Sequence, residues 1–234
     1  MILEVDNIHT YYGESHALQG VSLYLREGET VCLLGRNGAG KSTTLRSIIG
    51  LSPPRSGRVT FRGKDVTGQP AYRIARQGIG LVPEDRRIFP GLSVRENLEV
   101  AQYQRTGETR SWTIGRIFDE YPMLGELADQ DGATLSGGQQ QMLAVARALV
   151  PENQLLLIDE PSEGLAPVVI EQMMEAIRQL SAHTTVLLVE QNFIMASHLA
   201  DRYTIIETGR SVKSGLMADL IHDEATIQRY LGAT

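Results

Sequence analysis

Hydrophobic residues recur along the chain in two patterns, and each pattern predicts a different kind of strand. Near the N-terminus, Val21, Leu23 and Leu25 alternate with more polar residues, which is typical of a strand with one buried face. Runs of consecutive apolar residues are instead typical of strands that are buried on both faces. Buried strands are therefore predicted at residues 30–34, 155–158 and 185–189, with further short strands at 57–61 and 79–82.

Helical spacing of apolar residues dominates the middle of the chain. Met142, Val145, Ala146 and Leu149 are spaced i, i+3, i+4 and i+7, which places them on one face of a helix. Residues 93–96, SVRE, have the pattern of a capping box that opens a helix. Helices are also predicted at 41–49, 114–121 and 170–180. Because buried strands alternate with helices, the pattern indicates an α/β core with a parallel sheet, to which a strand-rich start and a helical middle are attached as subdomains.

The composition is that of an ordinary globular chain. Of 234 residues, 42% are hydrophobic and 21% are charged, which excludes a disordered or collagen-like chain. No window approaches the roughly 20 apolar residues that span a bilayer, and the N-terminus lacks the pattern of a signal peptide. The single cysteine, Cys32, cannot form an internal disulfide, so we expect a reducing compartment. A net charge of −6 gives no overall electrostatic footprint for nucleic acid, although a local basic patch is compatible with it.

Residues 35–42, GRNGAGKS, fit the pattern G-x-x-x-x-G-K-[ST] between a predicted buried strand and a predicted helix. Glycines allow a tight turn whose backbone N–H groups surround a phosphate, and the N-terminus of the following helix adds the positive end of its dipole. Lys41 would supply a point charge to the β- and γ-phosphates, and the Ser42 hydroxyl would ligate Mg²⁺. The alternative is a glycine-rich turn without a ligand, but both flanking elements are those that a phosphate loop requires.

Two acidic residues, Asp159 and Glu160, follow the predicted strand at 155–158. A carboxylate at the end of such a strand, beside a phosphate loop, can hold the coordination shell of Mg²⁺, and Asp159 has this position. Glu160 can then orient and deprotonate a water molecule in line with the γ-phosphate. Alone, two such acids are more typical of a solvated strand end; together with a phosphate loop they indicate catalysis.

A second glycine-containing helix start lies at residues 135–139, LSGGQ. Ser136, Gly137 and Gly138 bring together a hydroxyl, open backbone N–H groups and a helix dipole, which is a second arrangement for binding phosphate. The simpler interpretation is that Ser136 only caps the helix. Since one triphosphate does not need two such arrangements in one chain, the sequence favours a head-to-tail pair of ATPase domains, each completing its partner's site.

These three motifs, in this order, make the chain similar to the ATP-binding cassette ATPase of an ABC transporter, and the resemblance covers essentially the whole chain. It implies an α/β fold of the P-loop NTPase class, with a RecA-like core, an N-terminal antiparallel β subdomain and an inserted helical subdomain. A single ABC ATPase domain is expected over residues 1–234. Its nucleotide-binding core with the β subdomain would comprise 1–83 and 151–234, and the helical region would comprise 84–150.

The resemblance also implies which residues bind ATP and Mg²⁺. Tyr12 matches the aromatic residue that stacks on adenine, although an ordinary strand aromatic is the alternative. The residues expected to contact Mg²⁺ are Ser42, Asp159 and Glu84, and those expected in catalysis are Glu160, Gln191 and Glu84. The residues expected to contact the nucleotide are Tyr12, Gly35, Arg36, Asn37, Gly38, Ala39, Gly40, Lys41, Ser42, Thr43 and, from the partner cassette, Ser136, Gly137, Gly138 and Gln139.

Three further stretches resemble the ATPases of importers for branched-chain amino acids and for related amides or urea: residues 82–90, 160–167 and 188–192. This resemblance implies an ATP-hydrolysing subunit that energises uptake of branched-chain amino acids, with urea or short amides as alternatives. Its partners would be a second ATPase subunit, two membrane permease subunits and, indirectly, an extracytoplasmic solute-binding protein, with the chain peripheral on the cytoplasmic face of the inner membrane. Two functions outside transport are also weighed: a soluble ABC ATPase acting on ribosomes or DNA, which the acidic balance disfavours, and a nucleotide-binding regulator without turnover.

The chain departs from the general family pattern at three positions in these stretches. Glu84 replaces a glutamine that contacts Mg²⁺ and the attacking water, Ala166 replaces an aspartate that crosses the dimer interface, and Gln191 replaces a switch histidine. Glutamine cannot accept a proton at neutral pH, so the general base is expected to be Glu160 or solvent. Glu84 is either a negative group near Mg²⁺ or a solvated loop acid, and the sequence leaves both open.

Overall fold

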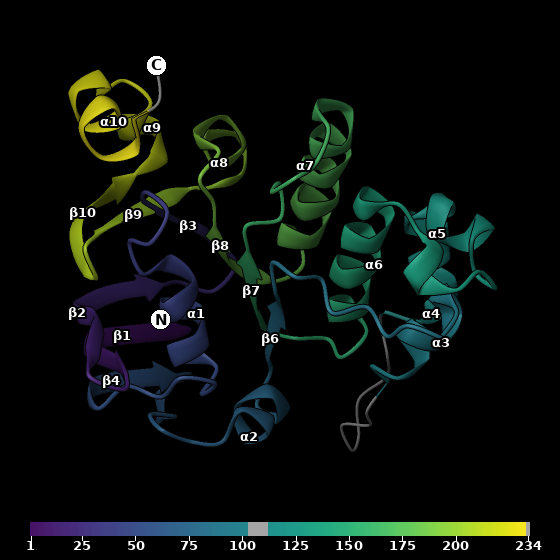
Figure 1. Ribbon diagram of the computed structural model, residues 1–234, viewed down its shortest axis with the longest axis horizontal. Helices are drawn as coiled ribbons and strands as arrows, with labels where there is room; N and C mark the ends of the chain where they lie inside the picture. The colour runs from purple at the N-terminus through teal and green to yellow at the C-terminus, as the bar shows by residue number, and fades with distance from the viewer. Residues whose placement is uncertain (103–111, 233–234) are drawn as a thin grey trace.

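The computed structural model describes residues 1–102 and 112–232, and in this part of the chain six strands form one sheet in the order β10-β9-β3-β8-β7-β6 (Figure 1). The bounds of these strands are Thr30–Leu34 for β3, Ile79–Val82 for β6, Leu155–Asp159 for β7, Thr185–Val189 for β8, Arg202–Glu207 for β9 and Arg210–Leu216 for β10. Neighbours from β9 to β6 are parallel, which confirms the predicted core, whereas β9 and β10 are antiparallel. This edge pair differs because Thr208 and Gly209, both with positive φ, form a two-residue hairpin turn that cannot connect parallel strands.

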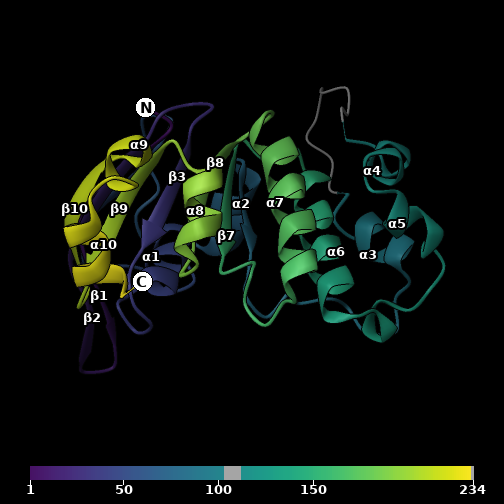
Figure 2. The same ribbon diagram turned by 90° about the horizontal axis from the view of Figure 1, so that it is seen from above.

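The strands predicted to be buried on both faces are buried because separate apolar cores cover the two faces of the sheet. Every residue of β3, β7 and β8 is buried. Leu156 and Ile158 pack into a core with helices α6 (Gly137–Leu149) and α7 (Pro167–Ser181), which lie side by side (Figure 2). Leu155 and Leu157 point to the other face, into a core with helix α1 (Lys41–Ile48) and a second sheet. Successive side chains of a strand point to opposite faces, so one apolar run serves both cores.

The second sheet has four strands in the order β2-β1-β4-β5, and all its neighbouring pairs are antiparallel. The bounds are Leu3–Tyr12 for β1, Ser15–Leu25 for β2, Ser56–Phe61 for β4 and Lys64–Asp65 for β5. Val21, Leu23 and Leu25 of β2 are buried, as their alternation predicts. The pattern did not delimit β1, because the register shifts between Val5 and Ile8 and the period of two is interrupted there.

The helices described between β6 and β7 lie at the end of the molecule remote from the second sheet (Figure 1). They are α3 (Val94–Glu99), α4 (Ile114–Glu120), α5 (Pro122–Glu126), a 3-10 turn at Gly132–Thr134, and α6. The capping box predicted at 93–96 opens α3: the Glu96 N–H donates to Ser93 Oγ, and the Ser93 N–H donates to the Glu96 carboxylate. Leu98, Ile117 and Leu124 anchor these helices in the same core as α6.

Five short α-helices of the described ranges were not predicted from the sequence. They are α2 (Ala71–Arg76), α5 (Pro122–Glu126), α8 (Phe193–Leu199), α9 (Met217–Leu220) and α10 (Glu224–Leu231). Each has at most eight residues, too few for a helical period to stand out from chance. None of the helices in the described ranges is both long enough and apolar enough to span a bilayer.

Candidate nucleotide site

The glycine-rich motif forms the loop that connects the buried strand β3 to helix α1. Gly35, Gly38 and Gly40 all have positive φ, a backbone conformation that is strained for residues with a Cβ. At Gly35 a Cβ would also overlap the carbonyl oxygen of Ile206 on β9. The helix predicted at 41–49 begins at Lys41, so the loop's backbone N–H groups lie at a helix N-terminus, where an anion is favoured.

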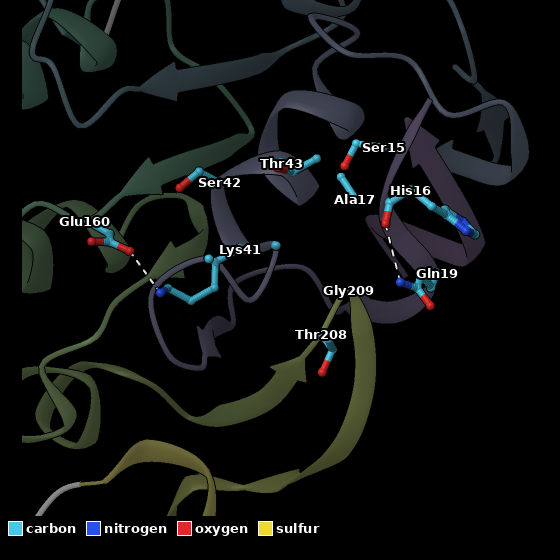
Figure 3. A pocket seen from close by; sticks show the side chains of 12 residues that line it. Ser15, His16, Ala17, Gln19, Lys41, Ser42, Thr43, Glu160, Thr208 and Gly209 are labelled. Atoms are coloured by element: carbon cyan, nitrogen blue, oxygen red, sulfur yellow. Dashed lines mark hydrogen bonds and ion pairs between the residues drawn. The ribbon is translucent and has the colours of Figure 1, made fainter. Parts of the chain in front are cut away.

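Lys41 is almost fully buried in this loop, with 3% of its side chain exposed. Its Nζ lies 3.0 Å from the carbonyl oxygen of Gly35, 3.4 Å from that of Arg36, and 3.0 Å from Oε1 of Glu160 (Figure 3). The structure therefore brings the predicted phosphate-binding lysine and the predicted general base into one ion pair. An anionic phosphate that approached Lys41 would compete with Glu160 for the ammonium group.

Ser42 and Asp159 are also in contact, although 117 positions separate them in the chain: the Ser42 hydroxyl donates to Oδ1 of Asp159 at 2.8 Å. Asp159 is the last residue of β7, and its burial raises the pKa of its carboxyl to about 6, while the hydrogen bond from Ser42 opposes this and the charges of Glu160 and Glu84 add to it. Within the described ranges, no group of three or more His, Cys, Asp or Glu is arranged to hold a metal ion. One hydroxyl and one carboxylate oxygen instead suit Mg²⁺, which usually keeps waters and phosphate oxygens as its other ligands.

Further carboxylates surround this pair. Glu160 follows β7 with φ of +43°, a strained conformation for a non-glycine residue, and its carboxylate faces Lys41. Glu163 was not singled out in the sequence, yet a hydrogen bond with Glu160, burial and the charge of Glu84 raise the pKa of its carboxyl. Glu84 is exposed beyond the end of β6, and its negative charge contributes to the raised pKa of the Asp159 and Glu163 carboxyls. The only signal for Glu163 was its place three residues after the predicted base.

A cavity of about 380 Å³ opens beside Lys41 (Figure 3). One wall is formed by the loop and the start of α1, and the other by the start of β2 and the β9–β10 turn. The lining residues are Ser15, His16, Ala17, Gln19, Gly38, Gly40, Lys41, Ser42, Thr43, Glu160, Thr208 and Gly209. The residues of β2 and the β9–β10 turn were missed in the sequence, because nothing in their local pattern marks them. The imidazole ring of His16 points away from Lys41, so its contribution is mainly backbone.

Tyr12 lies near this cavity but does not line it. Its side chain is 45% exposed, and its hydroxyl accepts a hydrogen bond from Ser52 at 3.3 Å. An exposed ring at the end of β1 is available for stacking, and its contact with adenine stays a prediction.

The LSGGQ motif lies elsewhere, at the start of α6, and none of Ser136, Gly137, Gly138 and Gln139 lines the cavity. Ser136 forms a capping box: its hydroxyl accepts from the Gln139 N–H at 3.3 Å, and its N–H donates to the Gln139 amide at 2.8 Å. The simpler interpretation of Ser136 as a cap therefore describes what it does within this chain. A Cβ at Gly138 would overlap Val169 of α7, so this glycine also permits close helix packing.

Gln191 follows β8 at the same edge of the sheet as Asp159 and is exposed. Its backbone N–H donates to the Glu190 carboxylate at 3.0 Å, as do the N–H groups of Asn192 at 3.0 Å and Ser162 at 3.1 Å. Glu190 is 1% exposed, and burial raises the pKa of its carboxyl. Glu190, which the sequence did not single out, thus ties the segment after β7 to the segment after β8. Ala166 is exposed just before α7.

The segment that follows Glu84 is hydrogen-bonded to α6 through Arg86 and Arg87, and we call residues 84–87 the Glu84 segment. Arg147 of α6 donates to the carbonyl oxygen of Arg87 at 2.7 Å and to that of Arg86 at 3.0 Å. Beside this segment lies an apolar groove of about 520 Å³, whose walls include Ala71, Tyr72, Ala75, Pro83, Phe89, Val100 and Ala144. Helix α6 therefore connects the LSGGQ motif, the Glu84 segment and the apolar groove.

Comparison with known proteins gives concordant matches. A family model described as ABC transporter matches residues 18–163. The chain is 42% identical over 232 residues to the high-affinity branched-chain amino acid transport ATP-binding protein BraG of Pseudomonas aeruginosa, covering 99% of this chain and 100% of that protein. It is 35% identical over 224 residues to the Nod factor export ATP-binding protein I of Burkholderia orbicola, covering 95% of this chain and 73% of that protein.

Among solved structures, the chain resembles a dimeric ATP-binding cassette in a post-hydrolysis state bound to ADP and Pi. The TM-score is 0.78 with 27% sequence identity, and the match covers 92% of this chain and 98% of that one. The fold predicted from the sequence, with its nucleotide-binding core and antiparallel β subdomain, is thereby confirmed.

Proposed function

Since the chain belongs to the ABC transporter family and is an ABC transporter ATPase, we propose that it energises the uptake of branched-chain amino acids. The observation that carries this proposal is the 42% identity over the full length of a branched-chain amino acid transport ATP-binding protein. Identity to the Nod factor export protein is lower, at 35%, and leaves about a quarter of that protein unmatched. Urea and short amides are the competing cargoes.

In the proposed reaction, the loop from Gly35 to Thr43 binds the triphosphate of ATP through its backbone N–H groups. Lys41 exchanges its ion pair with Glu160 for the β- and γ-phosphates, which leaves the Glu160 carboxylate free to orient a water molecule and to accept its proton. Ser42 and Asp159 would hold Mg²⁺, which neutralises charge on the phosphates. The 2.8 Å contact between Ser42 and Asp159 supports their assignment to one metal ion.

Gln191 and Glu84 have supporting roles in this proposal. The Gln191 amide donates to the γ-phosphate or to the attacking water, but it cannot act as a base, so proton acceptance falls to Glu160. Glu84 contributes a negative charge beside the metal ligands. This placement is supported by the effect of its charge on the pKa of Asp159.

The second phosphate-binding arrangement implies a second cassette. Because the LSGGQ residues do not line the cavity of their own chain, we assign Ser136, Gly137, Gly138 and Gln139 to the nucleotide of a partner. Two ATP molecules would then be held between two cassettes, and hydrolysis would release the pair. The dimeric cassette found among the similar structures supports this arrangement.

The permeases would dock in the apolar groove beside α2 and the Glu84 segment. Its aromatic and aliphatic lining can bury part of a partner helix, and Arg147 links the groove to α6. In this proposal the chain is a peripheral subunit at the cytoplasmic face of the inner membrane. A solute-binding protein would act through the permeases.

The deciding experiment is ATP turnover of the purified native complex in vesicles, stimulated by its solute-binding protein loaded with different cargoes. Leucine, isoleucine or valine should raise turnover severalfold over the unloaded protein, and a complex carrying Glu160→Gln supplies the background. Stimulation by urea or a short amide alone would refute the amino-acid assignment. A complex that lacks permease subunits would refute the role in transport.

A further inference from the structure

Charge is distributed very unevenly along this acidic chain. Residues 53–83 contain six basic residues and one acid, Asp65, a net charge of +5 in a chain whose total is −6. We call these six residues the basic band: Arg55, Arg58, Arg62, Lys64, Arg73 and Arg76. The chain therefore contains a local basic patch, which is compatible with its overall negative charge.

All six residues of the basic band are exposed. They come from β4, the edge strand β5, the turns next to these strands, and helix α2; Figure 1 shows β4 and α2 on the same side of the molecule. Strand β5 is the last strand of its sheet, so the band follows a free edge. Its cations are thus presented to solvent as an array.

The band is almost uncompensated by carboxylates. Arg58 lies 3.4 Å from Asp65, but both side chains are more than half exposed, so this pair is weak. Two further members have neutral partners: Arg62 donates to the Gln154 amide at 2.7 Å, and Arg55 donates to the Gly13 carbonyl at 2.8 Å. No ion pair within the described ranges joins Arg73 or Arg76 to an acid.

Helix α2 connects the basic band to the apolar groove. Ala71, Tyr72 and Ala75 line the groove, while Arg73 and Arg76 of the same helix belong to the band. Tyr72 is 58% exposed, and the guanidinium groups of both arginines lie 5.9 Å from its ring. This step rests on the proposed function, in which the permeases occupy the groove. The band then flanks the docked permease.

We propose that the basic band binds the anionic lipid headgroups of the membrane that holds the permeases. Clustered arginines and lysines are attracted to the negative cytoplasmic leaflet, and guanidinium groups match phosphate geometry. An exposed tyrosine beside two arginines is suited to the interface between water and lipid. An exposed array of cations fits a diffuse layer of headgroups, whereas the remaining negative charge of the chain opposes wrapping by nucleic acid.

The test uses the full chain and vesicles, without permeases. Sedimentation with vesicles of 30% phosphatidylglycerol in phosphatidylcholine should give binding about tenfold stronger than with phosphatidylcholine alone, and 0.5 M salt should abolish the difference. Arg73→Glu with Arg76→Glu should reduce this binding about tenfold. The matched control is Arg178→Glu with Arg229→Glu, which changes the net charge equally at two exposed arginines outside the band and should retain binding within about twofold.

Basal ATPase activity and circular dichroism should be unchanged in both double variants. If the variant with Arg73→Glu and Arg76→Glu does not fold, the variant with Arg58→Glu and Lys64→Glu takes its place. Equal loss in band and control variants would overturn the proposal, because only net charge would matter. Absent binding to anionic vesicles, or binding to a duplex oligonucleotide without binding to vesicles, would also overturn it. Failure of amino acids to stimulate the complex, with vesicle binding retained, would instead refute only the proposed cargo.

Discussion

Lys41 and the arginines of α2 carry the same charge in opposite surroundings. Lys41 is 3% exposed and lies 3.0 Å from the Glu160 carboxylate, in a group of acids that includes Asp159 and Glu163. Arg73 and Arg76 are exposed beside a tyrosine, and neither is in an ion pair with a carboxylate of the described residues. One buried cation faces several acids at the phosphate site, whereas six exposed cations face solvent in the basic band.

The difference between the phosphate site and the basic band concerns how function is divided among their side chains. At the proposed phosphate site the groups lie at the ends of buried strands and of a helix, and the proposed reaction gives each of them its own role. In the basic band the charges are interchangeable, since long exposed side chains interact with a surface collectively. Single substitutions should therefore have large effects at the first region and small effects at the second.

The largest effect is expected for Glu160→Gln. Removal of a general base typically lowers a rate by about 10²- to 10⁴-fold, so kcat for ATP hydrolysis should fall by that factor. Binding of ATP should persist, because glutamine keeps the shape of the side chain, and the closed dimer should accumulate. Single-turnover hydrolysis and size-exclusion chromatography with ATP measure the two results. Glu163→Gln is the matched control and should lower kcat by less than about tenfold; near wild-type hydrolysis by Glu160→Gln would remove Glu160 as the base.

Lys41→Ala should have the next largest effect, on nucleotide affinity. Loss of charge-assisted hydrogen bonds to phosphate should weaken ATP binding by roughly 10- to 100-fold. Equilibrium binding of a fluorescent ATP analogue measures it. The control is Lys64→Ala in the basic band, which removes the same charge at an exposed position and should change affinity by less than about twofold. Equal effects of the two lysines would erase the distinction between the regions.

The residues of the proposed phosphate site could be named from the sequence, whereas those of the basic band were not singled out there. Gly35 to Ser42 form one continuous motif, and Asp159 and Glu160 directly follow an apolar run, so spacing alone locates them. The parallel core was equally accessible, because the runs in β3, β7 and β8 are buried on both faces and contain no polar interruption.

What the sequence did not predict depends on contacts between distant segments. The wall of the cavity at β2 and at Thr208–Gly209 exists only because two separate sheets meet there, and no local pattern encodes that meeting. Glu190 similarly resembles a strand-end acid until its carboxylate is found to accept three backbone N–H groups. The bulge in β1 and the short helices of the C-terminal part were missed because their periods are interrupted or too short.

Asp159→Asn should remove part of the pH dependence of the stability of the nucleotide-free protein. Burial raises the pKa of the Asp159 carboxyl to about 6, above its value in an unfolded chain, so the native state binds the carboxyl proton more tightly than the unfolded state does. The free energy of unfolding should therefore fall as pH rises from about 4 to about 6 and stay lower above that range. Between pH 5 and pH 7.5 the wild type should lose about 1 kcal/mol more than Asp159→Asn, measured by urea unfolding at both values.

The matched control for this prediction is Asp65→Asn in the basic band region, where a hydrogen bond from Thr67 lowers the pKa of an exposed carboxyl. Its effect should have the opposite sign and lie at more acidic pH, since a lowered pKa favours the native state as pH rises. Identical pH profiles for the wild type and Asp159→Asn would show that burial does not raise the pKa of the Asp159 carboxyl, which would contradict the prediction.

Gln191→Ala should give the smallest effect and the most specific one. The Gln191 side chain is exposed in this structure and is expected to contribute one neutral hydrogen bond to the γ-phosphate or the attacking water, a contribution of about 1 kcal/mol. Turnover should therefore fall by roughly three- to tenfold with ATP affinity unchanged, because the fold of this edge depends on Glu190 rather than on the Gln191 amide. Gln179→Ala, another exposed glutamine, on α7, should leave turnover unchanged. If Gln191→Ala left the rate undiminished, Gln191 would have no catalytic role. The catalytic groups would then lie only at the start of α1 and at the end of β7, and the phosphate site would not extend to the residues after β8.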